Sequence, residues 1–160
     1  MRLTEALMVT LYLLKGKVRT QFSWNLYMFL IYMWCTDEIK IRPLKYVPTH
    51  FGPWCPKIQK TIQDLHDRGH ISSDYSDLEY VPEIDNDFNE EFFDENIAFM
   101  ITSKGEKYVE KIADVYEIDL TLPKFYRIFN YIEEVDVPFL VSVIKEQYPK
   151  MVKIRRRRTR

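Results

Sequence analysis

The sequence predicts a mainly helical α+β fold, in which a small β-hairpin follows three helices and further helices form the C-terminal third. Apolar residues recur at helical spacing in six segments, and two short apolar segments on either side of an acidic stretch have the character of paired strands. The 160 residues are 46% hydrophobic and 15% aromatic, which suffices for a folded core. We therefore expect one compact domain with an extension.

Two helices are expected at the start of the chain, over residues 4–14 and 21–34. In the first, leucines recur at helical spacing, and Gly16 follows as a stop signal. The second is apolar almost all round until Thr36 and Asp37 interrupt it, which is typical of a buried helix.

Residues 39–47 alternate only partly between polar and apolar and include a proline, so an extended connection or an edge strand is expected there. A third helix is expected over residues 56–68, because Pro56 suits a first turn and Gly69 follows the end of the pattern. One face of this helix carries an apolar stripe, Ile58, Ile62 and Leu65. The opposite face is polar and largely basic, and it consists of Lys57, Gln59, Lys60, Gln63, Asp64 and His66.

A β-hairpin is expected next, with one strand starting at about His70 and the other ending at Ile101. An acidic insertion, about residues 72–96, separates the two strands and is too charged to be core. A fourth helix then covers residues 103–116. It starts with Ser103-Lys104-Gly105-Glu106, which matches a capping box led by the serine. Residues 1–116 are thus expected to form the main domain.

Two more helices are expected within residues 117–149. The apolar residues of the first are Phe125, Ile128, Phe129, Ile132 and Val135. The second starts with Asp136 as its cap and carries Phe139, Leu140, Val143 and Ile144. Together they offer more apolar surface than a core of this size needs, so we expect a homodimer that forms through them.

Charge is distributed unevenly along the chain, although the net charge is only -1. Residues 1–70 carry +5, residues 71–96 carry -10, residues 97–146 carry -3 and residues 147–160 carry +7. The basic tail, residues 150–160, is expected to bind a nucleic-acid backbone, to pair with the acidic insertion, or to stay solvated. The insertion also contains aromatic residues, so both a protein-binding surface and a locally packed loop remain open.

Composition disfavours several function classes. Four glycines leave little material for the glycine-rich loops of nucleotide-binding enzymes, and no catalytic or metal-ligand spacing stands out, so we expect no enzyme, no cofactor and no metal. Cys35 and Cys55 are too few for a disulfide scaffold, and free thiols in a cytoplasmic protein are expected. The longest apolar run, residues 26–35, is too short to span a membrane.

Two motifs resemble those of winged helix-turn-helix proteins. Phe51-Gly52-Pro53-Trp54-Cys55-Pro56 and the apolar residues after it resemble the "YGP" signature of small prokaryotic and phage-associated winged-helix proteins. Residues 101–105, Ile-Thr-Ser-Lys-Gly, are similar to the "LT.KG" that follows the wing in MarR- and PadR-type regulators. The chain departs from the pattern at Cys55, where such families often have a serine cap, and in its long acidic insertion.

The resemblance implies a DNA-binding transcriptional regulator of a prokaryotic or viral genome, in which the third helix enters the major groove. Its lysines would contact phosphates and its amides would contact base edges. The residues expected to bind DNA are Arg19, Lys57, Gln59, Lys60, Gln63, His66, Lys153, Arg155, Arg156, Arg157, Arg158 and Arg160.

Two alternative functions remain open. In one, the chain is a winged-helix adaptor or antitoxin-like module that binds a protein partner through the acidic insertion. In the other, the arginine tail binds RNA.

Overall fold

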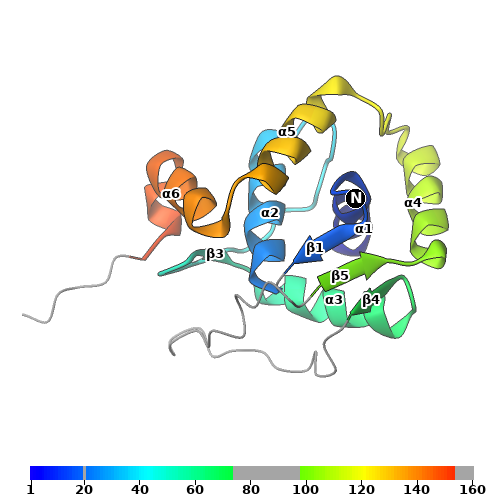
Figure 1. Ribbon diagram of the computed structural model, residues 1–160, viewed down its shortest axis with the longest axis horizontal. Coiled ribbons are helices and arrows are strands. Elements are labelled where there is room, and N and C mark those ends of the chain that lie inside the picture. Colours follow the sequence, from blue (N-terminus) through cyan, green and yellow to red (C-terminus); the bar gives the residue numbers. More distant parts are fainter. Residues whose placement is uncertain (20, 74–97, 154–160) are drawn as a thin grey trace, which may run out of the picture.

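The computed structural model describes residues 1–19, 21–73 and 98–153, to which all structural statements below refer. Their fold is mainly helical with small antiparallel sheets, so the predicted α+β class is confirmed (Figure 1). Most of the predicted acidic insertion and all arginines of the tail lie outside the described residues.

Helices α1 (Leu3–Leu13) and α2 (Gln21–Trp34) form the centre of the molecule. Helix α1 contacts each of the next four helices as well as β1 and β5. Burying one large aliphatic side chain stabilises a fold by roughly 1.5–3 kcal/mol, and these two helices supply many of them. The fully buried ones include Leu7, Met8, Leu11, Leu26, Met28 and Leu30.

A three-stranded antiparallel sheet packs against these helices, with the strand order β1-β5-β4. Strands β4 (Ile71–Ser73) and β5 (Ala98–Ile101) form the predicted hairpin, in which Ser73 lies opposite Phe99. Strand β1 (Lys17–Arg19) is an addition that the sequence did not indicate, and it places Val18 opposite Phe99 on the other side of β5. Trp24 of α2 meets Phe99 edge to face, with 6.1 Å between ring centroids, so the sheet is part of the core.

A second, two-stranded sheet is formed by the chain between α2 and α3 in the sequence. Its strands are β2 (Val47–Thr49) and β3 (Gly52–Trp54), so the predicted extended stretch becomes a strand only at its end. Pro48 and Pro53 lie opposite each other, which a short two-stranded ribbon tolerates because neither strand is a central one. Gly52 has a φ of 114°, a backbone conformation that favours glycine.

Helices α3 (Pro56–Asp67) and α4 (Ser103–Tyr116) flank the larger sheet in the sequence. The predicted serine cap of α4 is wrong, because Thr102 still has extended backbone angles and is therefore the last residue before the helix. The hydroxyl of Thr102 accepts a hydrogen bond from the Gly105 N–H at 3.1 Å. At its other end α4 is joined to α1, since the Tyr116 hydroxyl donates to Glu5 Oε1 at 2.9 Å.

The C-terminal part consists of α5 (Pro123–Glu134), α6 (Val137–Gln147) and a short 3-10 helix, η2 (Pro149–Met151). Asp136 caps α6 as predicted, because its carboxylate accepts from the Phe139 N–H at 2.8 Å. Most of the apolar side chains on which the prediction of a dimer rested are part of the chain's own core around α1 and α2. The buried ones are Phe125, Phe129, Ile132, Leu140 and Ile144, whereas Phe139 is 50% exposed.

Both cysteines are free, as predicted, and both are buried. Burial raises the pKa of the Cys35 thiol to about 11, so little of the reactive thiolate forms at neutral pH. None of the described helices is long and apolar enough to cross a membrane.

Candidate nucleic-acid interface

Helix α3 directs one face into the core and two lysines to the surface. Its apolar stripe is fully buried against α1 and α2, as the spacing predicts. Lys57 and Lys60, in the first turns of the helix, are exposed. The N-terminal half of α3 therefore presents two cations and no carboxylate.

The two glutamines of α3 are less accessible for contacts with DNA bases than predicted. Gln59 is only 1% exposed, so the prediction that its side chain faces a DNA groove is wrong. The reason is that α3 packs against two helices at once, which covers a wider arc than the apolar stripe alone indicates. Gln63 is half-buried, and its amide donates to Asp67 Oδ1 at 2.9 Å.

The C-terminal half of α3 has mixed charge. Asp64 pairs with Arg68 at 3.1 Å, and the half-exposed His66 lies 3.8 Å from Asp67. Such an exposed ion pair contributes only about 0–1 kcal/mol, but the Arg68 guanidinium partly neutralises the Asp64 carboxylate. The capacity of α3 to attract phosphate is therefore concentrated near its start.

The start of α3 is held by a residue of α2 that the sequence did not single out. Cys55 is the N-cap residue, and its side chain makes no capping hydrogen bond. Instead, its backbone N–H donates to Asn25 Oδ1 at 2.8 Å, and Asn25 is fully buried. An amide within an otherwise apolar helix was the signal that could have indicated this role.

The end of α3 is fixed by residues at the start of α4. Gly69, with a φ of 78°, ends the helix where predicted. Its carbonyl accepts from the Thr102 hydroxyl at 2.6 Å, and the carbonyl of Arg68 accepts from Lys104 Nζ at 2.7 Å. His70 then stacks on Tyr108 with 4.6 Å between ring centroids. Both ends of α3 are thus tied to other helices.

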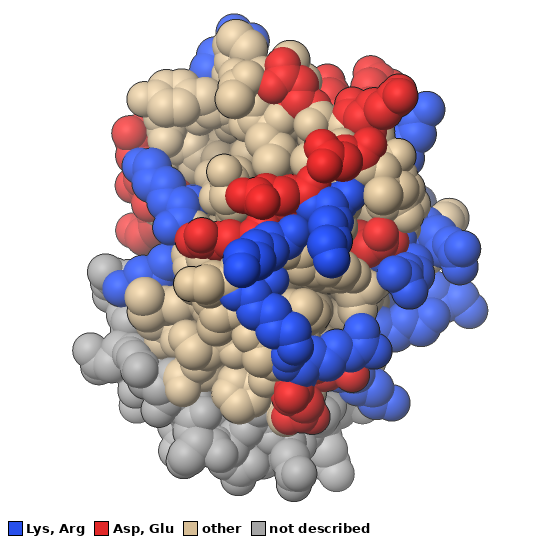
Figure 2. All heavy atoms as spheres, turned by 90° about the vertical axis from the view of Figure 1, so that its right-hand side faces the viewer, with Lys and Arg blue, Asp and Glu red and all other residues tan. Residues whose placement is uncertain are grey.

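A band of basic side chains extends beyond α3. Figure 2 shows lysines and arginines gathered across the middle of the face that carries α4, with carboxylates mainly above them. Arg68 and Lys104 act electrostatically on His70, while Arg2 and Arg42 act on Tyr116 at the far end of α4. These four cations come from separate segments of the chain, so the sequence could not indicate that they act on the two ends of α4. Such a surface attracts polyanions.

His70 gives the stability of this region a defined pH dependence. Burial lowers the pKa of His70, and the positive charges of Lys104 and Arg68 lower it further, against a smaller opposing effect of Asp64. As pH falls below about 6.5, the unfolded chain takes up a proton at this residue that the folded chain does not. We therefore expect the free energy of unfolding to fall as pH decreases through this range.

The measurement is the free energy of unfolding by urea between pH 5 and pH 8. His70→Phe keeps a ring to stack on Tyr108 but cannot titrate, so its advantage over the wild type should grow as pH falls. Parallel pH profiles for the two proteins would contradict the role assigned to His70.

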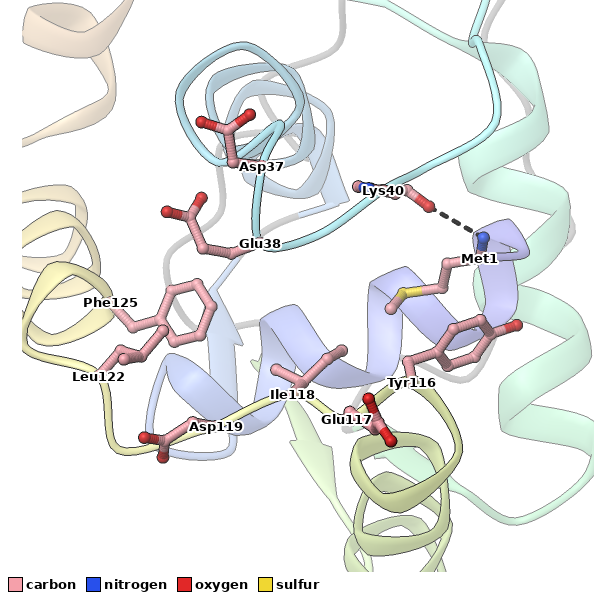
Figure 3. Close-up of a pocket in the computed structure, with 10 residues that line it drawn as sticks. All are labelled: Met1, Asp37, Glu38, Lys40, Tyr116, Glu117, Ile118, Asp119, Leu122 and Phe125. Carbon is pink, nitrogen blue, oxygen red and sulfur yellow. Dashed lines mark hydrogen bonds between the residues drawn. The ribbon is translucent and has the colours of Figure 1, made fainter.

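A pocket of 390 Å³ lies on another part of the molecule and is acidic. Asp37 and Glu38 lie on one side of it and Glu117 and Asp119 on the other, around an apolar floor that includes Phe125 (Figure 3). The Met1 amino group donates to the Lys40 carbonyl at its edge, at 2.9 Å. Four carboxylates make this pocket unsuitable for a phosphate-bearing ligand.

The remaining predicted DNA-binding residues are only partly described. Arg19 is the last residue of β1, and its side chain is outside the described part. Lys153 is exposed and lies beside β2, since its backbone N–H donates to the Thr49 carbonyl at 2.8 Å. The predicted arginines of the tail, Arg155, Arg156, Arg157, Arg158 and Arg160, lie outside the described residues.

Comparison with known proteins finds no protein family, no curated protein and no solved structure that matches this chain. Within residues 1–19, 21–73 and 98–153, no three histidine, cysteine or carboxylate side chains are grouped so that they could hold a metal ion.

Proposed function

We propose that the protein binds duplex DNA as a winged helix-turn-helix and acts as a transcriptional regulator, with α3 as the helix that enters the major groove. The observation that carries this proposal is α3 itself. Its inner face and both ends are tied to the core, while Lys57 and Lys60 are exposed at its start. A fixed helix with outward cations can contact phosphates in one register.

The order of elements supports the same proposal. Helices α1, α2 and α3 are followed by the hairpin β4–β5 and then by α4, as the motifs predict for a winged helix. With Gln59 buried, only Gln63 is left among the amides of α3 to read base edges. We therefore expect much of the affinity to be electrostatic and only weakly dependent on sequence.

A protein-binding adaptor is the second candidate function. The observation that favours it is the presence of Asp64 and Asp67 on the same helix as the lysines, because carboxylates repel phosphates. The homodimer and the cytoplasmic location stay predictions.

The direct test measures binding of the full chain to a 20-base-pair duplex of random sequence and to single-stranded RNA of equal length, at 50 and 200 mM NaCl. We expect the duplex to bind more tightly, with affinity falling steeply as salt rises. Preference for RNA would favour the tail as the main binding element. Absence of binding to either would favour the adaptor.

Removing the two lysines of α3 should weaken DNA binding. We expect Lys57→Ala/Lys60→Ala to lower duplex affinity about tenfold or more and to reduce the slope of log affinity against log salt by about 2, because two phosphate contacts are lost. Fluorescence anisotropy with a labelled duplex measures both quantities.

The matched control is Lys40→Ala/Arg127→Ala, which removes two exposed cations outside α3. This variant should lose little affinity. If both double variants lose affinity equally, α3 is not the DNA-binding element and only the total charge matters.

A further inference from the structure

The C-terminal end of the described chain is fastened to the tip of the β2–β3 hairpin. Val152 forms a parallel bridge with Thr49, and both residues are buried. The Lys153 N–H donates to the Thr49 carbonyl at 2.8 Å, and His50 Nδ1 lies 2.9 Å from the Lys153 carbonyl oxygen. Because a carbonyl oxygen only accepts, Nδ1 of His50 carries the proton in this bond. Lys153 therefore has a fixed position.

An open pocket of 490 Å³ lies between this fastened segment, the hairpin tip and α6. Its polar lining consists of His50, Ser142, Lys145 and Lys153, and Phe51 contributes to its apolar part. Ser142 already donates its hydroxyl proton to the Pro138 carbonyl at 3.1 Å. The two lysines are therefore the lining groups best suited to an anion.

The charge of this pocket distinguishes it from two others on the molecule. The pocket of Figure 3 is lined by four carboxylates together with Lys40, and a pocket beside the α5–α6 turn is lined by Glu133, Glu134 and Asp136 together with Lys15 and Lys17, so carboxylates outnumber lysines in both. The pocket at the hairpin tip has no carboxylate in its lining. Five arginines follow Lys153 within the next seven residues of the sequence.

We propose that this pocket binds a backbone phosphate of a nucleic acid, with Lys145 and Lys153 as its cationic ligands and His50 as the positioning residue that holds Lys153. The assignment of that nucleic acid as duplex DNA rests on the function proposed above. The pocket then serves as a second anchoring point on the nucleic-acid backbone, in addition to α3.

The β2–β3 hairpin connects the pocket at its tip to α3. Strand β3 leads from the tip through Cys55 directly into α3, so His50 precedes Pro56 by six residues. At about 3.3 Å per residue, the backbones of His50 at the pocket and Pro56 at the start of α3 are at most roughly 20 Å apart. This is less than one helical turn of duplex DNA, about 34 Å, so one duplex is long enough to reach both sites.

The test uses the full chain, the labelled 20-base-pair duplex and single-stranded RNA of 20 nucleotides, between 50 and 200 mM NaCl. Lys145→Glu should lower duplex affinity about tenfold and reduce the salt slope by about 1. Arg127→Glu, the same charge reversal at an exposed position of α5, should change affinity less than twofold. Equal losses in the two variants would overturn the proposal.

The role of His50 is tested separately. His50→Ala should weaken binding severalfold, while His50→Asn, whose amide can donate to the same carbonyl, should restore it. A structural role alone would change the denaturation midpoint in both variants but would not produce this difference in affinity. Equal affinity of His50→Ala and the wild type would overturn the positioning role.

The same measurements separate this inference from the proposed function. If Lys57→Ala/Lys60→Ala leaves duplex binding intact while Lys145→Glu weakens it, the pocket is supported and the role of α3 fails. If Lys145→Glu affects only RNA binding, the bound phosphate belongs to RNA, and the assignment to duplex DNA fails. If the wild type binds neither nucleic acid, both proposals are overturned.

Discussion

Gly105→Ala is expected to lower the free energy of unfolding by about 3 kcal/mol, because the added methyl group has no space. A Cβ at Gly105 would overlap the carbonyl oxygen of His70 and would lie 2.9 Å from side-chain atoms of Ile101 and Met8. The His70 carbonyl cannot easily move, since it accepts from the Thr102 N–H at 3.1 Å. The first turn of α4 must therefore separate from the start of β4.

Urea denaturation followed by circular dichroism measures this loss. Gly69→Ala is the matched control: its Cβ would meet only Lys104 Cδ at 4.0 Å, so its cost is the left-handed backbone alone, about 1–2 kcal/mol. A midpoint for Gly105→Ala at or above that of Gly69→Ala would show that α4 does not approach the His70 backbone so closely. If Gly105→Ala is instead the less stable of the two variants, the glycine at the end of the sequence similar to "LT.KG" is needed because a side chain at this position has no space.

Asn25→Ala is expected to lower the free energy of unfolding by about 2–3 kcal/mol, since it leaves the Cys55 N–H without its partner and opens a space in the core. The start of α3 then loses its hydrogen bond to α2. Under conditions in which the variant is still folded, duplex affinity should fall as well, because the position of Lys57 depends on this helix end.

Both effects are measured on the same preparation, by denaturation and by fluorescence anisotropy. Asn130→Ala in α5 removes a half-exposed amide and should change stability by no more than about 0.5 kcal/mol. If Asn25→Ala is as stable as Asn130→Ala, the hydrogen bond between α2 and α3 does not hold the interface in place.

Local sequence signals predicted the helices well. Periodicity indicated all six helices and placed the first four with ends near those observed, and Pro56, Gly69 and Asp136 act at helix ends as expected. These signals depend on neighbours within one or two turns, which a sequence displays directly. Strand β1 escaped notice because three residues carry too little periodicity, and its pairing with β5 spans about 80 residues.

The candidate site was harder to predict than the fold. Gln59 is polar and was therefore expected to be exposed, yet it is buried on a helix that packs against both α1 and α2. For the same reason the sequence overstated the apolar surface left over in the C-terminal helices, since most of the apolar side chains of α5 and α6 pack into the chain's own core. Asn25, Arg2 and Arg42 gain their roles only from partners distant in sequence, so a one-dimensional pattern cannot reveal them.

Because Ser73 lies opposite Phe99, the segment between them leaves and rejoins the sheet at adjacent positions. The stretch of sequence between the last residue of β4 and the first residue of β5 has 24 residues, 74–97. Each doubling of the length of a segment closed in this way costs only about 0.6 kcal/mol, so replacements of many lengths are compatible with the same sheet. Selection can therefore change the charge or binding partner carried at this position while α3 and its supports stay as they are.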